Sequence, residues 1–291
     1  MGLRKLLVAV VACLSALLVV PAPAGAVASC GKWERRVFAI TATGGLVQHT
    51  FCLDANRTTM SRWTSESVVA TTGWADTATA FWSGKLHDSG GVYYRVSAST
   101  GALLWSNDLT SWRYVGTGRD WRDYTSLIST EPGVIYGTDR YGVLHRWAHL
   151  GWRDGSNQWS DDVPLQGSPG ARLLGSTSDG LVGVPNVPNV VQVWTPSLAA
   201  KFRIFVPPGV DPNRLVPFDL ELRFRNSAFG LTSAGRIVVL LPTVCAEADR
   251  MWKADDETGA GGYRLIFAGN YVPYSGPVEW QCNGMTPGPA N

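Results

Sequence analysis

The segment Val134-Ile-Tyr-Gly-Thr-Asp-Arg-Tyr-Gly142-Val-Leu-His-Arg-Trp147 carries the pattern that decides the fold. Apolar and aromatic residues lead into a short polar turn with a glycine, and a second apolar run follows. Glycine adopts the positive φ that tight hairpin turns require, so this pattern predicts a strand, a turn and a returning strand. The segment is therefore expected to form an antiparallel hairpin.

The same pattern recurs along the chain, which indicates an internal repeat. The copies are Val37-Phe-Ala-Ile-Thr-Ala-Thr-Gly-Gly45-Leu-Val47, Val92-Tyr-Tyr-Arg-Val-Ser-Ala-Ser-Thr-Gly101-Ala-Leu-Leu-Trp105, the weaker Leu173-Leu-Gly-Ser-Thr-Ser-Asp-Gly180-Leu-Val182 and Phe229-Gly-Leu-Thr-Ser-Ala-Gly235-Arg-Ile-Val-Val239. Their glycines lie 56, 41, 38 and 55 residues apart. Repeats of roughly 40–55 residues with several short strands are typical of propeller blades. We therefore predict an all-β fold, a small five-bladed β-propeller; the alternative is a β-sandwich with similar hairpins.

Pairs of tryptophans occupy the segments between the first hairpins. They are Trp63 and Trp74, Trp112 and Trp121, and Trp152 and Trp159. The arrangement of Gly-x(0–2)-Trp, an aromatic, Gly-Val-Ile/Tyr-Tyr, a polar turn and Gly-x-Leu resembles the repeats of tachylectin-type five-bladed propeller lectins. The resemblance covers residues 63–160 best and is poor after residue 185. It implies binding of N-acetylated aminosugars, one site per blade, without metal. Because the spacing is unequal and the last two copies lack the tryptophan pair, two or three sites are expected.

Three Trp-x-Asp triplets supply the candidate ligand-binding residues. An aromatic plane stacks on the C–H face of a sugar, while carboxylate and guanidinium groups bind its hydroxyl or amide groups. In the alternative interpretation the tryptophans fill the core between blades and the aspartates cap turns. The candidates are Trp74, Asp76, Trp121, Arg122, Asp123, Trp152, Arg153 and Asp154.

The first residues predict export. Arg4 and Lys5 precede an apolar run from Leu6 to Val20, and small residues with A-x-A-like cleavage sites follow. We expect residues 1–28 to be a cleaved signal peptide, residues 29–282 the propeller and residues 283–291 a flexible tail. An alternative is a lipoprotein anchored through Cys30, since Val27-Ala28-Ser29-Cys30 loosely resembles a lipobox.

Cysteine parity favours the cleaved leader. Its removal leaves an even set suited to two disulfides in an oxidising compartment. Sequence cannot choose among the three possible pairings, of which we favour the nearest-neighbour one. The four are Cys30, Cys52, Cys245 and Cys282.

Charge and motifs narrow the partners and the chemistry. Without Arg4 and Lys5 the chain has 23 basic and 23 acidic residues, so no electrostatic footprint for nucleic acid or an anionic membrane is expected. We therefore expect no nucleic-acid partner, and no membrane association unless Cys30 is lipidated. The excess of arginine over lysine indicates a GC-rich bacterial genome. We find no catalytic motif, and expect no metal and no cofactor. The preferred function is a secreted, lectin-like, non-catalytic propeller whose partner is a glycan or cell-surface polysaccharide.

Two other functions stay open. One is a secreted structural or protein-interaction propeller, which buried tryptophans would favour. The other is a glycoside hydrolase, which needs converging carboxylates. Its candidates are Asp76, Asp123, Asp139 and Glu221.

The C-terminal third gives further expectations. The proline-rich segments 184–188 and 206–212 predict loop insertions, and residues 249–262 a polar loop. The alternation of residues 218–225 predicts one half-buried strand. If the propeller closes, residues 33–51 should share a blade with strands near 263–267, which removes two open edges.

Overall fold

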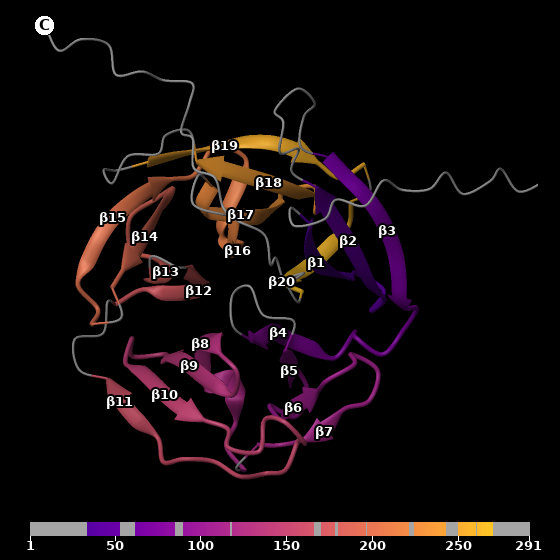
Figure 1. The fold of residues 1–291 in the computed structure, drawn as a ribbon, viewed down its shortest axis with the longest axis vertical. Helices are drawn as coiled ribbons and strands as arrows, with labels where there is room; N and C mark the ends of the chain where they lie inside the picture. Colours follow the sequence, from indigo (N-terminus) through magenta and orange to yellow (C-terminus); the bar gives the residue numbers. More distant parts are fainter. Residues whose placement is uncertain are drawn as a thin grey trace, which may run out of the picture.

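The computed structural model is a five-bladed β-propeller in which the blades are arranged in a ring (Figure 1), and their inner strands line a central channel. It describes residues 34–52, 62–84, 90–116, 118–165, 170–177, 180–195, 197–220, 224–242, 250–259 and 261–269. The predicted leader, residues 1–28, and the predicted tail, residues 283–291, lie outside these ranges. The predicted all-β propeller is confirmed, and the β-sandwich alternative is wrong.

Each blade has four antiparallel strands, with its first strand next to the channel. Blade 2 contains β4 (Thr77–Gly84), β5 (Gly91–Ser97), β6 (Leu103–Ser106) and β7 (Arg113–Tyr114). Blade 3 contains β8 (Tyr124–Glu131), β9 (Val134–Asp139), β10 (Leu144–Ala148) and β11 (Val163–Leu165). Blade 4 contains β12 (Arg172–Thr177), β13 (Gly180–Val184), β14 (Val190–Trp194) and β15 (Ala200–Phe205). Blade 5 contains β16 (Val210–Leu220), β17 (Phe224–Thr232), β18 (Ile237–Pro242) and β19 (Arg250–Glu257).

Blade 1 closes the ring with strands from both ends of the described chain. Its inner strand is β20 (Tyr263–Ala268), which pairs with β1 (Glu34–Thr41), followed by β2 (Leu46–Cys52) and β3 (Arg62–Ala70). Val37 lies opposite Ala268 and Ile40 opposite Leu265. The predicted sharing of one blade by the two ends is confirmed. This pairing satisfies the backbone edge that β1 would otherwise expose.

Blades 4 and 5 are also joined at their outer edges. β15 pairs in parallel with β19, with Ile204 opposite Arg250 and Phe205 opposite Met251. The two blades therefore form one eight-stranded sheet. The same pairing corrects the prediction for residues 249–262, most of which form a strand and not a polar loop. The charged residues of β19 are compatible with a strand because it is the outermost in its blade.

Four of the five predicted hairpins occupy the same place in their blades, between the second and third strands. They are β1–β2, β5–β6, β9–β10 and β17–β18. The place predicted for the fourth copy is wrong, because Gly180 starts β13 and belongs to the β12–β13 hairpin between the first and second strands of the blade. The equivalent turn of blade 4 is residues 185–189, which lacks glycine and was expected to be an insertion.

Two other expectations for the last blade need correction. Residues 218–225 span the end of β16 and the start of β17, with Leu220 opposite Phe224, so the alternating segment belongs to two strands. Part of the proline-rich segment 206–212 lies in β16, which includes Pro212 and Pro217. Proline is tolerated there because β16 is the innermost strand and pairs on one side only.

Apolar side chains fill the space between blades. One cluster joins Trp121, Trp147 and Trp105 of blades 2 and 3 with their neighbours. Another joins Trp74 to Phe267 of the closing strand and to Phe229 of blade 5. The burial of these large side chains fixes each blade against the next.

Candidate functional site

The first two predicted tryptophans lie where one blade docks on the next. The backbone N–H of Trp74 donates to the carbonyl of Gly44, and that of Trp121 to the carbonyl of Gly101, both at 3.0 Å. Tyr263 makes the same 3.0 Å bond to Gly235. The repeated Gly…Trp pattern thus marks a structural junction, in which a residue entering one blade binds the turn glycine of the preceding blade.

The rings of Trp74 and Trp121 are covered. Trp74 is 2% exposed and is packed between Phe267, Trp112 and Arg95, at ring centroid or guanidinium distances of 5.7, 5.3 and 5.1 Å. Trp121 is 1% exposed and contacts Trp147 and Trp159. Neither ring has a free face on which a sugar could stack. These two tryptophans fill the core between blades, as the alternative interpretation expects.

The third tryptophan, Trp152, is half-buried. The guanidinium of Arg153 lies 5.0 Å from its ring centroid, and both Arg153 and Asp154 are exposed. Asp154 accepts a 2.9 Å hydrogen bond from the N–H of Ser156, which lowers the pKa of its carboxyl. This triplet therefore combines a partly accessible aromatic with a turn-capping aspartate.

Asp76 and Arg122 converge on one turn, residues 97–101. Asp76 accepts hydrogen bonds from Ser97 Oγ at 2.6 Å and from the N–H of Ser99 at 2.7 Å, and these bonds lower the pKa of its carboxyl. Arg122 donates to the carbonyls of Ala98 and Ser99 at 3.0 Å from the other side. Asp123 is exposed. The pair clamps the turn that receives Trp121.

Among the predicted disulfide cysteines, Cys52 alone lies in the described ranges, where it ends β2 opposite Glu34. Cys30 precedes Glu34 by four residues, which is compatible with the favoured Cys30–Cys52 pairing. Cys30, Cys245 and Cys282 lie outside the described residues, as does Glu221. The disulfide pairing stays a prediction.

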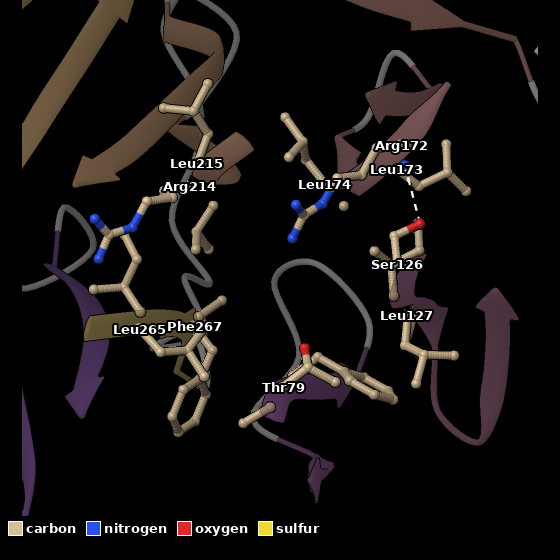
Figure 2. A pocket seen from close by; sticks show the side chains of 18 of the residues that line it. Thr79, Ser126, Leu127, Arg172, Leu173, Leu174, Arg214, Leu215, Leu265 and Phe267 are labelled. Atoms are coloured by element: carbon tan, nitrogen blue, oxygen red, sulfur yellow. Dashed lines mark hydrogen bonds between the residues drawn. The ribbon is translucent and has the colours of Figure 1, made fainter. Parts of the chain in front are cut away.

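The central channel is the feature that sequence analysis missed. It encloses about 560 Å³ and is lined by the inner strands of all five blades. Figure 2 shows apolar side chains such as Leu127, Leu215 and Phe267 on its walls, together with Thr79 and Arg172. The sequence contains one signal for this channel. In three blades an arginine follows the docking residue, which is the residue that enters the blade and contacts the turn glycine of the preceding blade. Only the fold shows that these arginines line one channel.

Four arginines and one aspartate are the charged side chains among the described lining residues. They are Arg122, Arg172, Arg214, Arg264 and Asp211. All belong to the first part of an inner strand or directly precede one, so they lie toward the channel end that carries the docking turns. Thr79, Thr125, Ser129, Ser176 and Asn213 also belong to the lining, and the hydroxyls of Thr125 and Ser129 donate to backbone carbonyls.

Two of the arginines tie neighbouring blades together. Arg214 of blade 5 donates to the carbonyl of Arg264 at 2.9 Å, and Arg264 of blade 1 donates to the carbonyls of Trp74 and Thr77 at 2.6 and 2.8 Å. Burial lowers the pKa of Arg264 below its usual range. These guanidinium groups supply donors for carbonyls at the start of an adjacent inner strand.

No group of three or more residues suited to a metal ion occurs among the described residues. Within the same ranges, no helix has the length and apolar character needed to cross a membrane. His145 and His149 have separate environments, since His145 contacts Asp162 at 2.9 Å whereas His149 is buried against Tyr94.

Comparisons with known proteins find solved structures of low similarity. No family model matches the chain, and no curated protein matches it. A chain of a nidogen/laminin complex is 11% identical with a TM-score of 0.45, over 81% of this chain and 98% of that one. Virginiamycin B lyase from Staphylococcus aureus is 10% identical with a TM-score of 0.34, over 70% of this chain and 65% of that one. Such values transfer neither a ligand nor an activity, and it is the sheet topology of the chain itself that makes it a five-bladed β-propeller.

Proposed function

We propose that this protein is an exported, non-catalytic binding propeller that takes a carbohydrate into its central channel. The observation that carries the proposal is the channel itself, a cavity of about 560 Å³ with a mixed polar and apolar lining. Cavities of roughly 300–1,000 Å³ are the usual size for small-molecule sites. Export follows from the predicted leader.

The lining has the chemistry that a sugar requires. Residues with hydroxyl or amide side chains from blades 2, 3, 4 and 5 line the same channel as the guanidinium group of Arg172. Leu265 of blade 1, which is half-buried, supplies apolar surface for the C–H face of a sugar ring. A saccharide has both kinds of surface, and it would contact several blades at once.

The channel is a better site than the Trp-x-Asp triplets. A tryptophan must leave one ring face open to stack on a sugar, and the rings of Trp74 and Trp121 are buried. Trp152 keeps partial exposure and is the one triplet with an accessible ring. We therefore propose one central site in place of the equivalent sites on separate blades that the lectin resemblance implies.

Binding is favoured over hydrolysis by the carboxylates of the channel. Glycoside hydrolases generally place two carboxylates across the scissile bond. Among the described lining residues the channel has one, Asp211. Asp76 and Asp139 instead bind the backbone of turns.

A protein-interaction propeller is the second candidate, and the burial of Trp74 and Trp121 together with exposed apolar side chains favours it. Tyr141 is 77% exposed in the β9–β10 turn, and Val187 is 49% exposed in the β13–β14 turn. These turns belong to adjacent blades and occupy equivalent places, so they present apolar groups on one face of the propeller.

The test is a glycan array with the purified mature protein and two variants. Thr79→Trp places an indole in the channel, and Ser67→Trp places one on β3, the outer strand of blade 1, where Ser67 is exposed. We expect glycan binding by the wild type and by Ser67→Trp, and its loss in Thr79→Trp. No binding by the wild type to any glycan, or undiminished binding by Thr79→Trp, would contradict the proposal.

A further inference from the structure

The residue that follows the docking residue is arginine in three blades. Arg122 follows Trp121, Arg172 follows Ala171 and Arg264 follows Tyr263. Ala171 is 2% exposed like the other docking residues, and Gly170 lies against the turn glycine Gly142, in keeping with the same junction. All three arginines line the channel, so the propeller repeats a guanidinium at this place.

Two of these three guanidinium groups bind the protein. Arg122 forms an ion pair with Asp120 at 2.6 Å and bonds the turn of blade 2, and this contact holds the pKa of Asp120 at about 2. Arg264 binds carbonyls of blade 2. Arg214, on the inner strand β16 of the neighbouring blade 5, binds carbonyls of blade 1. Their donors are largely used within the fold.

Arg172 differs from the others. Its guanidinium makes no hydrogen bond or ion pair with any other described residue, and the residue is exposed. Figure 2 shows its side chain extending from β12 toward the middle of the channel, whereas that of Arg214 turns away toward β20. The one acidic residue of the described lining, Asp211, accepts a hydrogen bond from the N–H of Asn213 at 2.8 Å.

We propose that Arg172 is the anchor of an anion subsite and that the ligand of the channel is an acidic saccharide, one that carries a carboxylate or a sulfate. A free guanidinium binds such groups through two parallel N–H donors. The inference rests on the proposed function, and it adds the class of saccharide and the residue that selects it.

The surrounding charge supports an anion. Four arginines against one aspartate give the described lining an excess of positive charge. Arg214 and Arg264 contribute to this potential because their partners are neutral carbonyls, whereas the charge of Arg122 is offset by its ion pair with Asp120. In a channel enclosed by protein, such charge attracts anions more strongly than it would on an open surface.

The experiment compares acidic glycans with their neutral counterparts. The array contains uronate oligosaccharides beside their methyl esters, and sulfated oligosaccharides beside their unsulfated forms. We expect wild-type protein to bind at least one acidic class about tenfold more tightly than its neutral counterpart, because a charge-assisted hydrogen bond contributes that much. The preference should weaken at 0.5 M salt, and the class that shows it identifies the anionic group.

Arg172→Gln is the variant that tests the anchor, with Arg146→Gln on β10, away from the channel lining, as its matched control. We expect Arg172→Gln to bind acidic and neutral members equally, and Arg146→Gln to behave like the wild type. Equal binding of both classes by the wild type, or an unchanged preference in Arg172→Gln, would overturn the inference while leaving the proposed function intact. An array without any bound glycan would contradict the proposed function itself.

Discussion

Single glycines in the turns at the blade junctions are constrained by their backbone conformation and by their packing. Gly101 has a φ of +71°, and a Cβ added to it would lie 2.0 Å from Asp120 Oδ1. Gly142 has a similar φ of +82°, but its added Cβ would meet no atom closer than 3.9 Å. A side chain at Gly142 would therefore cause backbone strain only, whereas one at Gly101 would cause backbone strain and a steric clash.

We expect Gly142→Ala to lower the free energy of unfolding by about 1–2 kcal/mol, the cost of the left-handed conformation for a side chain. Gly101→Ala should cost more, because Asp120 is also held by its ion pair with Arg122. Urea unfolding of both variants measures the difference. Equal losses would show that the junction at Gly101 yields to an extra methyl group.

Trp121 provides the second test at this scale. Its burial among Trp147, Trp159 and Tyr124 predicts that Trp121→Ala lowers the free energy of unfolding by about 3–5 kcal/mol. Tyr141→Ala, at a 77% exposed site, should change it by less than about 0.5 kcal/mol. A small effect of Trp121→Ala in urea unfolding would contradict the core role. If Trp121→Ala also lost sugar binding, that loss would reflect impaired folding and not the loss of a direct contact with the sugar.

At the scale of elements, a buried histidine joins blades 2 and 3. His149 Nε2 lies 2.8 Å from the carbonyl oxygen of Ser156, so it carries the proton. Nδ1 then accepts the 2.7 Å bond from the hydroxyl of Tyr94 on β5. Protonation of Nδ1 would remove this acceptor from a site where both side chains are buried.

This pair predicts a stability that depends on pH. Burial lowers the pKa of His149 in the folded state below the ordinary value of 6.5, and it lowers the pKa of His49 in blade 1 likewise. The unfolded chain therefore binds protons first, and stability is full above pH 6.5 and declines as the pH falls below it.

Urea midpoints at pH 7.5, 6.5 and 5.5 measure this decline. In His149→Gln the urea midpoint should fall less steeply with decreasing pH, but it should still fall, because His49 still titrates. Midpoints that do not change between pH 7.5 and pH 5.5, or a slope equally steep in the variant, would contradict the prediction.

At the scale of the whole molecule, closure depends on β20. This strand supplies the inner wall of blade 1, and Arg264 on it binds carbonyls of blade 2. Without it, β1 has an open edge and the buried face of Phe38 loses its stacking partner Phe267. The ring would then be open between blades 5 and 1.

Two truncated chains test the closure. A chain that ends at Gly262 lacks β20, and one that ends at Gly269 retains it; both lack Cys282, so the predicted disulfide does not distinguish them. We expect the longer chain to unfold cooperatively and the shorter one to aggregate or to lose its cooperative transition. Similar thermal unfolding of the two chains would show that the propeller does not need its closing strand.

The sequence by itself determined the repeated module, because hairpin turns and strand alternation are local patterns. It located the turns at Gly101, Gly142 and Gly235, and it predicted the pairing of residues 33–51 with 263–267. It misplaced the fourth copy at Gly180, since the blade 4 turn uses residues 185–189 and has no glycine to mark it. Residues 249–262 looked like a loop because an outermost strand can carry charges.

Only the tertiary structure decided which repeated residues are buried and which face the channel. The Trp-x-Asp pattern fits a sugar platform and a blade junction equally well in sequence, and the contacts of Trp74 and Trp121 with the next blade decide for the junction. Arg122, Arg172 and Arg264 are far apart along the chain, and they line one channel because each lies at or just before the start of an inner strand of the same ring. The partner of a guanidinium is a property of the neighbouring blade, which no local pattern contains.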